Sequence, residues 1–226
     1  MTETQLEELI NELNINPQSS KFILTQISSD VYFGKVWNHL PWENQIEYQG
    51  DKYYFINRID HGFIGTIEMT SSEMHAYLNP NFRGSGIMCN TLREIILPHA
   101  FRYNKTDVLR ITIDQNFHGE QFTQIEHSAT LAGFKDKHTI VDQLFEYFAY
   151  KNEYPEFHYP EGFSQSISEK EFNFMHDRVN TINAQLQYLK ERYEILFNEE
   201  DKLITFLIKN MELFEQLYEE KIRTSL

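Results

Sequence analysis

The sequence predicts an α/β protein of the α+β type, in which helices flank a mixed central sheet and a helical region follows. Between residues 21 and 150, short β-branched apolar runs are bounded by turn residues and alternate with segments of helical period. From residue 164 onward there is neither glycine nor proline. We therefore expect an N-terminal helix at 1–20, a mixed domain at 21–163 and a C-terminal helical hairpin or coiled coil at 164–226.

The composition is that of a folded protein. Its 226 residues are 41% hydrophobic and 15% aromatic, which excludes general disorder. No apolar run approaches the ~18 residues of a membrane span, and the acidic start does not resemble a signal peptide. The single cysteine, Cys89, excludes an internal disulfide and a cysteine-cluster metal site. We expect a soluble, cytoplasmic protein with no metal and no membrane contact.

The charge also restricts the partners. Thirty-four acidic residues outnumber 20 Lys and Arg, so the formal net charge is −14. Nucleic-acid binding needs a clustered basic face to displace counterions, and the basic residues here are scattered. The sequence therefore predicts no nucleic-acid partner. The acidic surface either suits cationic partners such as amines or serves only solubility.

The first 42 residues predict two helices around one strand. Leu6, Leu9, Ile10 and Leu13 recur at helical spacing, and Thr2 or Thr4 is the candidate cap. A strand is expected at 22–27, and a helix at 31–40 that Pro41 closes. The aromatic residues of this helix and its exit either pack on the sheet or line an acceptor pocket: Tyr32, Phe33, Trp37 and Trp42.

The remaining elements of the mixed domain follow from alternation, helical period and turn residues. The expected strands are 52–59, its hairpin partner 63–69 after the turn at 60–62, then 73–78 and 108–113. The segment 139–150 is one long strand or two. The expected helices are 87–101, after a loop at 79–86, and 120–132, which Gly133 stops.

The tail carries a heptad seam with alternating steps of three and four. This pattern predicts packed or coiled helices. Its members are Phe172, Met175, Val179, Ile182, Leu186, Leu189, Tyr193 and Leu196. The acidic cluster at 198–201 is a candidate corner with a new N-cap, which makes a hairpin. One unbroken helix of ~55 residues is the alternative. The apolar seam either packs on the same chain or builds a homodimer.

The segment that carries chemistry is the loop after strand 73–78. Arg83-Gly84-Ser85-Gly86 leads directly into a helix that begins at Ile87. Glycines allow successive backbone N–H groups to point into one concavity, and a helix N-terminus adds partial positive charge. A pyrophosphate fits such a loop, and Arg83 adds charge at its rim.

At this point the sequence resembles the GNAT acetyltransferase superfamily, and more narrowly its branch that acetylates ribosomal-protein N-termini. A Glu-led strand, a proline, an aromatic residue and Arg-Gly-x-Gly before a helix carry the resemblance, and here they span Glu73 to Met88. Ala100-Phe101, the strand running toward Asn116, and Gly133-Phe134 follow in the family's order. The resemblance covers about 22–150.

The resemblance implies a GNAT-like splayed sheet that holds acetyl-CoA in a V-shaped opening. The pyrophosphate would then bind the backbone of the segment Arg83, Gly84, Ser85, Gly86, Ile87 and Met88, with Asn116 beyond the neighbouring strand. The pantetheine arm would pair with the backbone near Tyr77, Leu78 and Asn79. The acetyl group would pass directly to the amine of a small molecule or peptide.

The same resemblance suggests the catalytic groups. Glu73 matches the acidic residue that opens the family's strand and is the candidate base; His75 shares its strand face. Where many members have a tyrosine that protonates the thiolate, this chain has Ala129, and the interval from Asn116 to Gly133 is longer than usual. His118, His127 and water remain as alternatives for the acid.

The sequence thus predicts an acyltransferase enzyme, an acetyl-CoA-dependent N-acetyltransferase. Two other functions stay open. The first is a catalytically silent GNAT-like protein that binds CoA and acts through its C-terminal helices, which the missing tyrosine favours. The second is an acyltransferase that uses a longer acyl-CoA.

Overall fold

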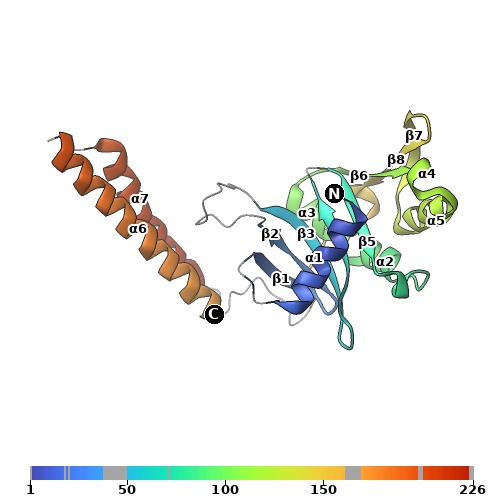
Figure 1. Ribbon diagram of the computed structural model, residues 1–226, viewed down its shortest axis with the longest axis horizontal. Coiled ribbons are helices and arrows are strands. Elements are labelled where there is room, and N and C mark those ends of the chain that lie inside the picture. Colours follow the sequence, from blue (N-terminus) through green and yellow to red (C-terminus); the bar gives the residue numbers. More distant parts are fainter. Residues whose placement is uncertain are drawn as a thin grey trace. The chain divides into compact units, whose positions relative to one another are not determined.

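The computed structural model describes residues 2–17, 19, 21–37, 50–70, 72–160, 169–197 and 201–223. The chain divides into two compact units, Met1–Ser164 and Gln165–Leu226. The first unit is an α+β domain and the second is a pair of helices (Figure 1). The α+β class and the C-terminal helix pair are therefore confirmed. None of the described helices is both long and apolar enough to cross a membrane.

The larger sheet is antiparallel and follows the chain order. Its strands are β1 (Phe22–Ser28), β2 (Val31–Val36), β3 (Asp51–Arg58), β4 (Gly62–Met69) and β5 (Met74–Leu78). The smaller sheet has the order β6-β8-β7, and its strands are β6 (Val108–Asp114), β7 (Lys135–Val141) and β8 (Leu144–Tyr150). The segment 139–150 therefore contains the end of β7 and the whole of β8, which are joined by a turn at 142–143.

Helices cover both faces of the larger sheet. On one face lies α1 (Glu3–Ile15), which begins with a capping box on Thr2 and buries Leu6, Leu9, Ile10 and Leu13 (Figure 1). On the other face lies a continuous helical segment, composed of α2 (Ile87–Thr91), a π-helical turn (Leu92–Ile96) and α3 (Leu97–Asn104). Pro98 cannot donate a backbone hydrogen bond, which accounts for the irregular turn directly before it.

The predicted helix at 31–40 is wrong. Residues 31–36 form β2, which pairs with β1 and β3, while residues 38–40 and Trp42 lie outside the described residues. A turn at Ser29 and Asp30 joins β1 to β2 as a hairpin. A Cβ at Gly34 would collide with the carbonyl of Ile23, so this glycine permits the close strand approach. Phe33 is buried in the core.

The remaining helices of this unit follow β6. They are a short α4 (Gln115–His118), a 3-10 turn (Gly119–Gln121) and α5 (Phe122–Ala132). Gly133 ends α5 in the left-handed conformation, with φ of 106°. The sequence therefore identified both this helix and its stop.

The second unit is a hairpin of α6 (Glu169–Phe197) and α7 (Lys202–Arg223). The two helices lie side by side, which excludes the single helix of ~55 residues (Figure 1). The Asp201 carboxylate caps α7 by accepting hydrogen bonds from the backbone N–H groups of Leu203 (2.8 Å) and Ile204 (2.9 Å). The expected corner with a new N-cap is confirmed at this residue.

Candidate active site

The two sheets meet at one point and then separate. Glu73 and Arg110 form a parallel β-bridge, and the Arg110 N–H donates to the Ser72 carbonyl at 2.8 Å. Among the described strands, β5 pairs beyond this bridge only with β4, and β6 only with β8. The parallel strands β5 and β6 therefore diverge with their facing backbone edges unpaired; we call the region between these two edges the opening, and the bridge marks its closed end.

The free edge of β5 presents alternate backbone groups to this opening. The N–H groups of Thr70 and Asn79 bond to the carbonyls of Glu73 (3.0 Å) and Ile64 (2.9 Å), so odd-numbered residues of β5 use their backbone groups on β4. In an antiparallel pair, the residues in between direct their backbone N–H and C=O groups away from the partner strand. The N–H and C=O groups of Met74, Ala76 and Leu78 therefore face the opening.

This alternation divides the residues that the resemblance assigned to the pantetheine arm into those whose backbone groups face the opening and those whose backbone groups face β4. Leu78 faces the opening, whereas Tyr77 and Asn79 direct their backbone groups toward β4. Ala76 is exposed and also faces the opening, although the sequence reasoning did not single it out. Strand parity relative to a known turn would have found it.

At the open end, β5 leads into the glycine loop. A 3-10 turn (Pro80–Phe82) follows Asn79, and Gly84 and Gly86 then adopt left-handed φ values of 75° and 79°. A Cβ at Gly84 would meet nothing within 4 Å. The glycine is therefore needed there for backbone conformation and not for lack of space.

The helix that follows has no side-chain cap. Gly86 is the N-cap of α2, and as a glycine it has no side chain that could cap the N–H groups of the first turn, where Ile87 and Met88 lie. Because the helical segment continues to Asn104, its N-terminus carries partial positive charge beside these N–H groups. Exposed Ser85 donates its hydroxyl to the Phe82 carbonyl at 2.6 Å and shapes the loop. This arrangement suits a phosphate group.

Arg83 makes contacts that sequence reasoning missed. Its Nε donates to the Leu78 carbonyl at 2.9 Å, and its Nη2 lies 3.5 Å from Glu3 Oε2 of α1. The guanidinium also lies 5.8 Å from the ring centre of Tyr77. The side chain thus ties the loop to β5 and α1, so the loop offers a ligand mainly its backbone groups.

Asn116 lies at the same end of the opening as the glycine loop. β5 and β6 are parallel, so their C-terminal ends meet at one edge, and Asn116 follows β6 at the start of α4. Its N–H donates to Asp114 Oδ1 at 2.8 Å. Nearby, α2 lies against α5, where Cys89 Sγ is 3.4 Å from the Ser128 carbonyl.

The structure does not select the acid that would protonate a thiolate. Ala129 is buried in the core at the position where the resemblance expects a tyrosine. His127 is exposed on α5, and His118 is partly buried at the end of α4. Both histidines follow β6 in the chain, and this placement does not favour one over the other.

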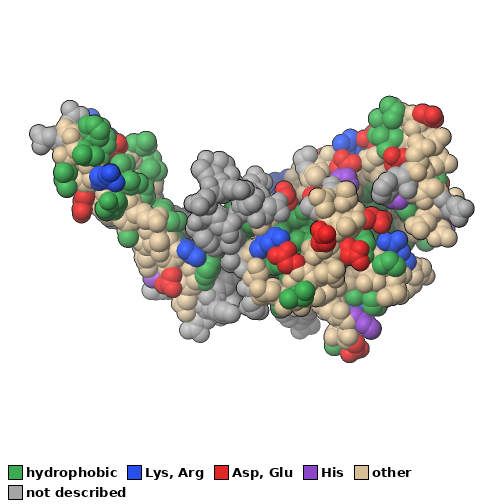
Figure 2. Space-filling view, in the orientation of Figure 1, with side chains coloured by type: hydrophobic (Ala, Val, Ile, Leu, Met, Phe, Trp, Pro, Cys, Tyr) green, Lys and Arg blue, Asp and Glu red, His purple; other side chains and the backbone are tan. Residues whose placement is uncertain are grey.

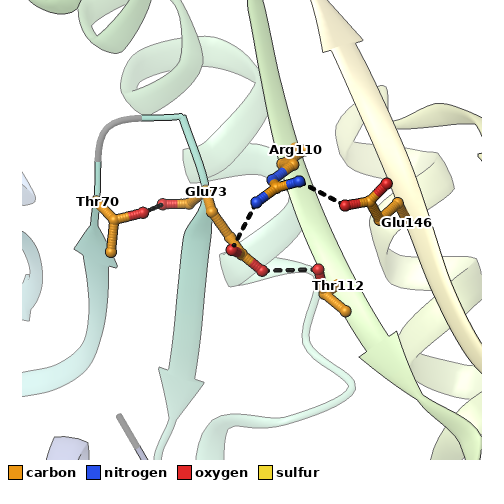
Figure 3. Close-up of polar contacts among 5 residues, drawn as sticks. All are labelled: Thr70, Glu73, Arg110, Thr112 and Glu146. Carbon is orange, nitrogen blue, oxygen red and sulfur yellow. Dashed lines mark hydrogen bonds and ion pairs between the residues drawn. The ribbon is translucent and has the colours of Figure 1, made fainter. Parts of the chain in front are cut away.

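A polar cluster occupies the closed end of the opening (Figure 3). Glu73 accepts a hydrogen bond from Thr112 Oγ1 at 2.6 Å and pairs with Arg110 Nη2 at 3.3 Å. Arg110 Nη1 also donates to Glu146 Oε1 at 2.6 Å. Thr70 donates its hydroxyl to the Glu73 carbonyl at 3.1 Å. The alternation of polar Arg110 and Thr112 with apolar neighbours on β6 was the sequence signal for this face.

One nitrogen of Arg110 takes no part in the cluster. Its Nε atom is buried and has no hydrogen-bond partner within the described part of the chain. The side chain itself is 40% exposed, so the guanidinium is reachable from solvent. Nε itself lies below the surface, so the exposed part of the side chain is its other atoms, and a bound group would meet the positive charge of the guanidinium and not this N–H.

A glutamate and a histidine form a second polar pair on the same face. His75 is half-buried and stands directly opposite Glu68 on β4. Glu68 is only 8% exposed and accepts a hydrogen bond from the Tyr53 hydroxyl at 3.2 Å. Burial and the Glu68 charge raise the pKa of Tyr53, which keeps the phenol protonated.

Residue parity places His75 and Glu73 on one face of β5. This face therefore joins Glu68, Glu73 and Glu146 with one guanidinium, which leaves an excess of negative charge. Among the residues that the structure describes, no group of three His, Cys, Asp or Glu side chains is arranged to hold a metal ion.

Comparison with family models and with curated proteins finds no match. Among solved structures, the chain is similar to the N-acetyltransferase PseH of Campylobacter jejuni, with 17% identity, 67% of this chain and 83% of that chain covered, and a TM-score of 0.35. A complex of PseH with acetyl coenzyme A gives 16% identity, the same coverage and a TM-score of 0.32.

The chain is also similar to the dodecameric spermidine N-acetyltransferase of Vibrio cholerae. Here the identity is 10%, the coverage is 68% of this chain and 92% of that chain, and the TM-score is 0.39. At these identities and scores the activity of this chain has to be derived from its own residues.

Proposed function

We propose that the protein is an acetyl-CoA-dependent N-acetyltransferase that transfers an acetyl group directly to a primary amine. One observation carries the proposal: a single opening between parallel strands joins an uncapped glycine loop at its open end to a carboxylate cluster at its closed end. The resemblance of the segment Glu73 to Phe134 to the GNAT superfamily supports the same assignment.

The cofactor would lie along β5. Its pyrophosphate would bind the backbone N–H groups of the loop and first helical turn, from Gly84 to Met88, with Asn116 at the opposite side. Its pantetheine arm would pair with the backbone groups of Ala76 and with the N–H of Leu78, whose carbonyl already accepts a hydrogen bond from Arg83. Five residues of β5 span about 17 Å, so the thioester would approach the Glu73 end.

The transfer would then be a direct acyl substitution. The neutral amine attacks the thioester carbonyl carbon, a C–N bond forms, and the C–S bond breaks with release of the CoA thiolate. Glu73 or His75 takes the proton that the amine loses. The thiolate takes a proton from His118, His127 or water. The positive charge of the partly exposed Arg110 guanidinium is suited to the charge that develops on the carbonyl oxygen.

The acceptor would enter from the face that carries Glu68, Glu73 and Glu146. Excess negative charge there favours an ammonium group over a neutral or anionic acceptor. The resemblance to the ribosomal-protein branch favours a protein N-terminus, while the charge alone serves a small-molecule amine equally well.

A second function has a specific observation in its favour. Both Glu73 carboxylate oxygens already have partners, Thr112 and Arg110, and Ala129 occupies the position of the family's acid. These features suit a protein that binds CoA without transferring its acyl group. Such a protein would share the loop and strand edge but not the reaction.

Calorimetric titration with acetyl-CoA tests the site. We expect micromolar binding, about −8 kcal/mol at ~1 µM, that weakens at least tenfold in Gly86→Asp. Ile23→Asp places the same charge on exposed β1, at the edge of the larger sheet farthest from β5, and should bind as wild type. No binding by folded wild type would overturn both functions. Binding without release of free thiol toward a panel of primary amines would favour the silent protein.

A further inference from the structure

The N-terminal helix reaches the glycine loop. α1 lies against β4 and β5 (Figure 1), and its first turn places Glu3 Oε2 3.5 Å from Nη2 of Arg83, the residue that begins the loop. No sequence pattern connects the two residues, because 80 positions separate them. The contact therefore joins the candidate site to a part of the chain that the resemblance, which covers about 22–150, does not include.

Helix α1 is fixed on the larger sheet along its whole length. Its first turn has the capping box on Thr2. Near its end, Asn14 Nδ2 donates to the Phe63 carbonyl at 2.9 Å, and the Phe63 N–H donates to Asn14 Oδ1 at 2.8 Å. The side chains between these ends are buried: Leu6, Leu9, Ile10 and Leu13. The backbone at Glu3 therefore has a fixed position relative to β5.

The glycine loop has little packing of its own. Gly84, Ser85 and Gly86 are all exposed. Within the described part of the chain, a Cβ at Gly84 would meet nothing within 4 Å, and a Cβ at Gly86 would meet only Asn90 Nδ2 at 3.7 Å. The hydrogen bond from the Ser85 hydroxyl to the Phe82 carbonyl lies within the turn and ties it to no other element. The position of the loop thus depends on the residues at its two ends.

Arg83 is the end residue that connects the loop to two other elements. Its Nε donates to the Leu78 carbonyl of β5 at 2.9 Å, and its Nη2 pairs with Glu3 of α1. The guanidinium also lies 5.8 Å from the ring centre of Tyr77, which is 4% exposed. A guanidinium is planar and its donors have fixed directions, so two partners on different nitrogens fix its orientation.

Without this partner, the Glu3 carboxylate would oppose a phosphate ligand. α1 carries four glutamates and no basic residue, and acidic side chains lie over this helix in Figure 2. A carboxylate beside the glycine loop repels a pyrophosphate. In the ion pair, Arg83 balances the charge of Glu3. The placement of Glu3 is therefore explained by its contact with Arg83 and not by a direct contact with a ligand.

We propose that Glu3 is a positioning residue of the cofactor site: through Arg83 it holds the glycine loop at the end of β5, so that the loop N–H groups are in place before a pyrophosphate binds. Arg83 is a positioning residue too, and its guanidinium stays on Leu78 and Glu3 when the cofactor is bound. The inference rests on the proposed binding of acetyl-CoA and makes α1 a part of that site.

Two roles of Arg83 predict opposite effects of removing the Glu3 carboxylate. If Arg83 left Glu3 to bond directly to the pyrophosphate, Glu3→Ala would free the guanidinium and lower the Kd for acetyl-CoA. If Arg83 positions the loop from Glu3, Glu3→Ala loosens the loop and raises the Kd. Calorimetric titration of the full chain should show a rise of about two- to fivefold, as an exposed ion pair allows. An equal or lower Kd overturns the proposal.

Two comparisons make this measurement specific. Glu8→Ala removes the same charge from the exposed side of the same helix and should leave the Kd as in wild type. S-acetylpantetheine has the thioester and the pantetheine arm but no pyrophosphate, so Glu3→Ala and wild type should bind it equally. An equal loss for this shorter ligand would place the effect on β5 and not on the loop, and would overturn the proposal.

A double-mutant cycle tests whether Glu3 acts through Arg83. Arg83→Gln should raise the Kd at least tenfold, and Glu3→Ala should then cause no further loss. An unchanged Kd in Arg83→Gln, or a further two- to fivefold loss in the double variant, overturns the proposal. Both side chains are partly exposed, so neither substitution removes buried packing. No binding by wild type would overturn this inference together with the proposed function, whereas normal binding without the Glu3 effect overturns this inference alone.

Discussion

Glu73 and Arg110 are joined twice, once through the backbone bridge between the two sheets and once through their side chains at 3.3 Å. The backbone contact fixes where β5 and β6 begin to separate. The side-chain contact places a carboxylate at that same point, with Thr112 and Glu146 as further partners of the cluster. Glu73 is therefore both the residue at which the opening begins and the candidate base.

Glu73→Gln separates these two roles. The amide keeps the shape of the side chain and loses the charge, so the fold and the Kd for acetyl-CoA should change little. If Glu73 is the base, the rate of thiol release should fall about 10²–10⁴-fold. Asp30→Asn removes a carboxylate from an ion pair with Arg58 outside the site and is the control, with a rate close to wild type. The full rate in Glu73→Gln would transfer the base role to His75.

Ala76→Pro tests the backbone edge of β5. Proline has no N–H, and at residue 76 that group faces the opening, so the ladder with β4 should persist. We expect normal thermal stability and at least tenfold weaker binding of acetyl-CoA in calorimetry. Tyr77→Pro removes an N–H that is used on β4 and should lower the Tm. Equal binding by Ala76→Pro and wild type would contradict the placement of the pantetheine arm.

His99 predicts how stability depends on pH. Its side chain is 3% exposed and is surrounded by aromatic rings, and its Nδ1 atom lies 2.9 Å from the Tyr54 hydroxyl. Burial lowers the pKa of His99 from 6.5 to about 4, and the charge of Arg102 contributes a smaller effect in the same direction. Between these values the unfolded chain binds more protons, so stability is complete above pH 6.5 and falls as the pH drops toward 4.

The expected loss from pH 7 to pH 5 is about 2 kcal/mol for this residue. Urea unfolding at the two pH values measures it. His99→Asn should be less stable at both but should lose less on acidification, while His127→Gln changes an exposed histidine and should keep the wild-type slope. An unaltered slope in His99→Asn would show that other groups cause the dependence.

Asp201→Ala tests the start of α7. The substitution leaves the N–H groups of Leu203 and Ile204 without their carboxylate, which should destabilise the helix by about 1 kcal/mol. Thermal unfolding followed at 222 nm should show a lower midpoint for the hairpin. Lys202→Ala changes the adjacent exposed residue and should leave the midpoint within error; equal midpoints for both variants would argue against the cap.

Local patterns in the sequence predicted most elements correctly. Helical spacing identified α1, the apolar and polar alternation identified β6, and Asp201 marked the corner of the hairpin. The segment Val31–Val36 failed because a short aromatic run fits a helix or a strand, and its pairing with β1 and β3 decided between them.

Contacts between distant residues were beyond local patterns. Glu3 reaches Arg83 across 80 positions, and Arg110 meets Glu73 and Glu146 only because two sheets converge. The heptad seam was recognised as apolar, yet only packing in the hairpin divides it into covered Leu186 and uncovered Leu189. Such divisions follow from rotation about a helix axis and need the partner helix to be known.

The opening offers a ligand mostly main-chain atoms, from Ala76 and Leu78 along β5 to the turn after Gly86. Main-chain atoms are the same in every residue type, so such a site places few demands on side chains. Substitutions can accumulate along it while strand parity and the left-handed positions of Gly84 and Gly86 are kept. Relatives of this chain should therefore be sought by strand register and glycine spacing. Residue identity along the strand and loop changes without changing the main-chain atoms that the site uses.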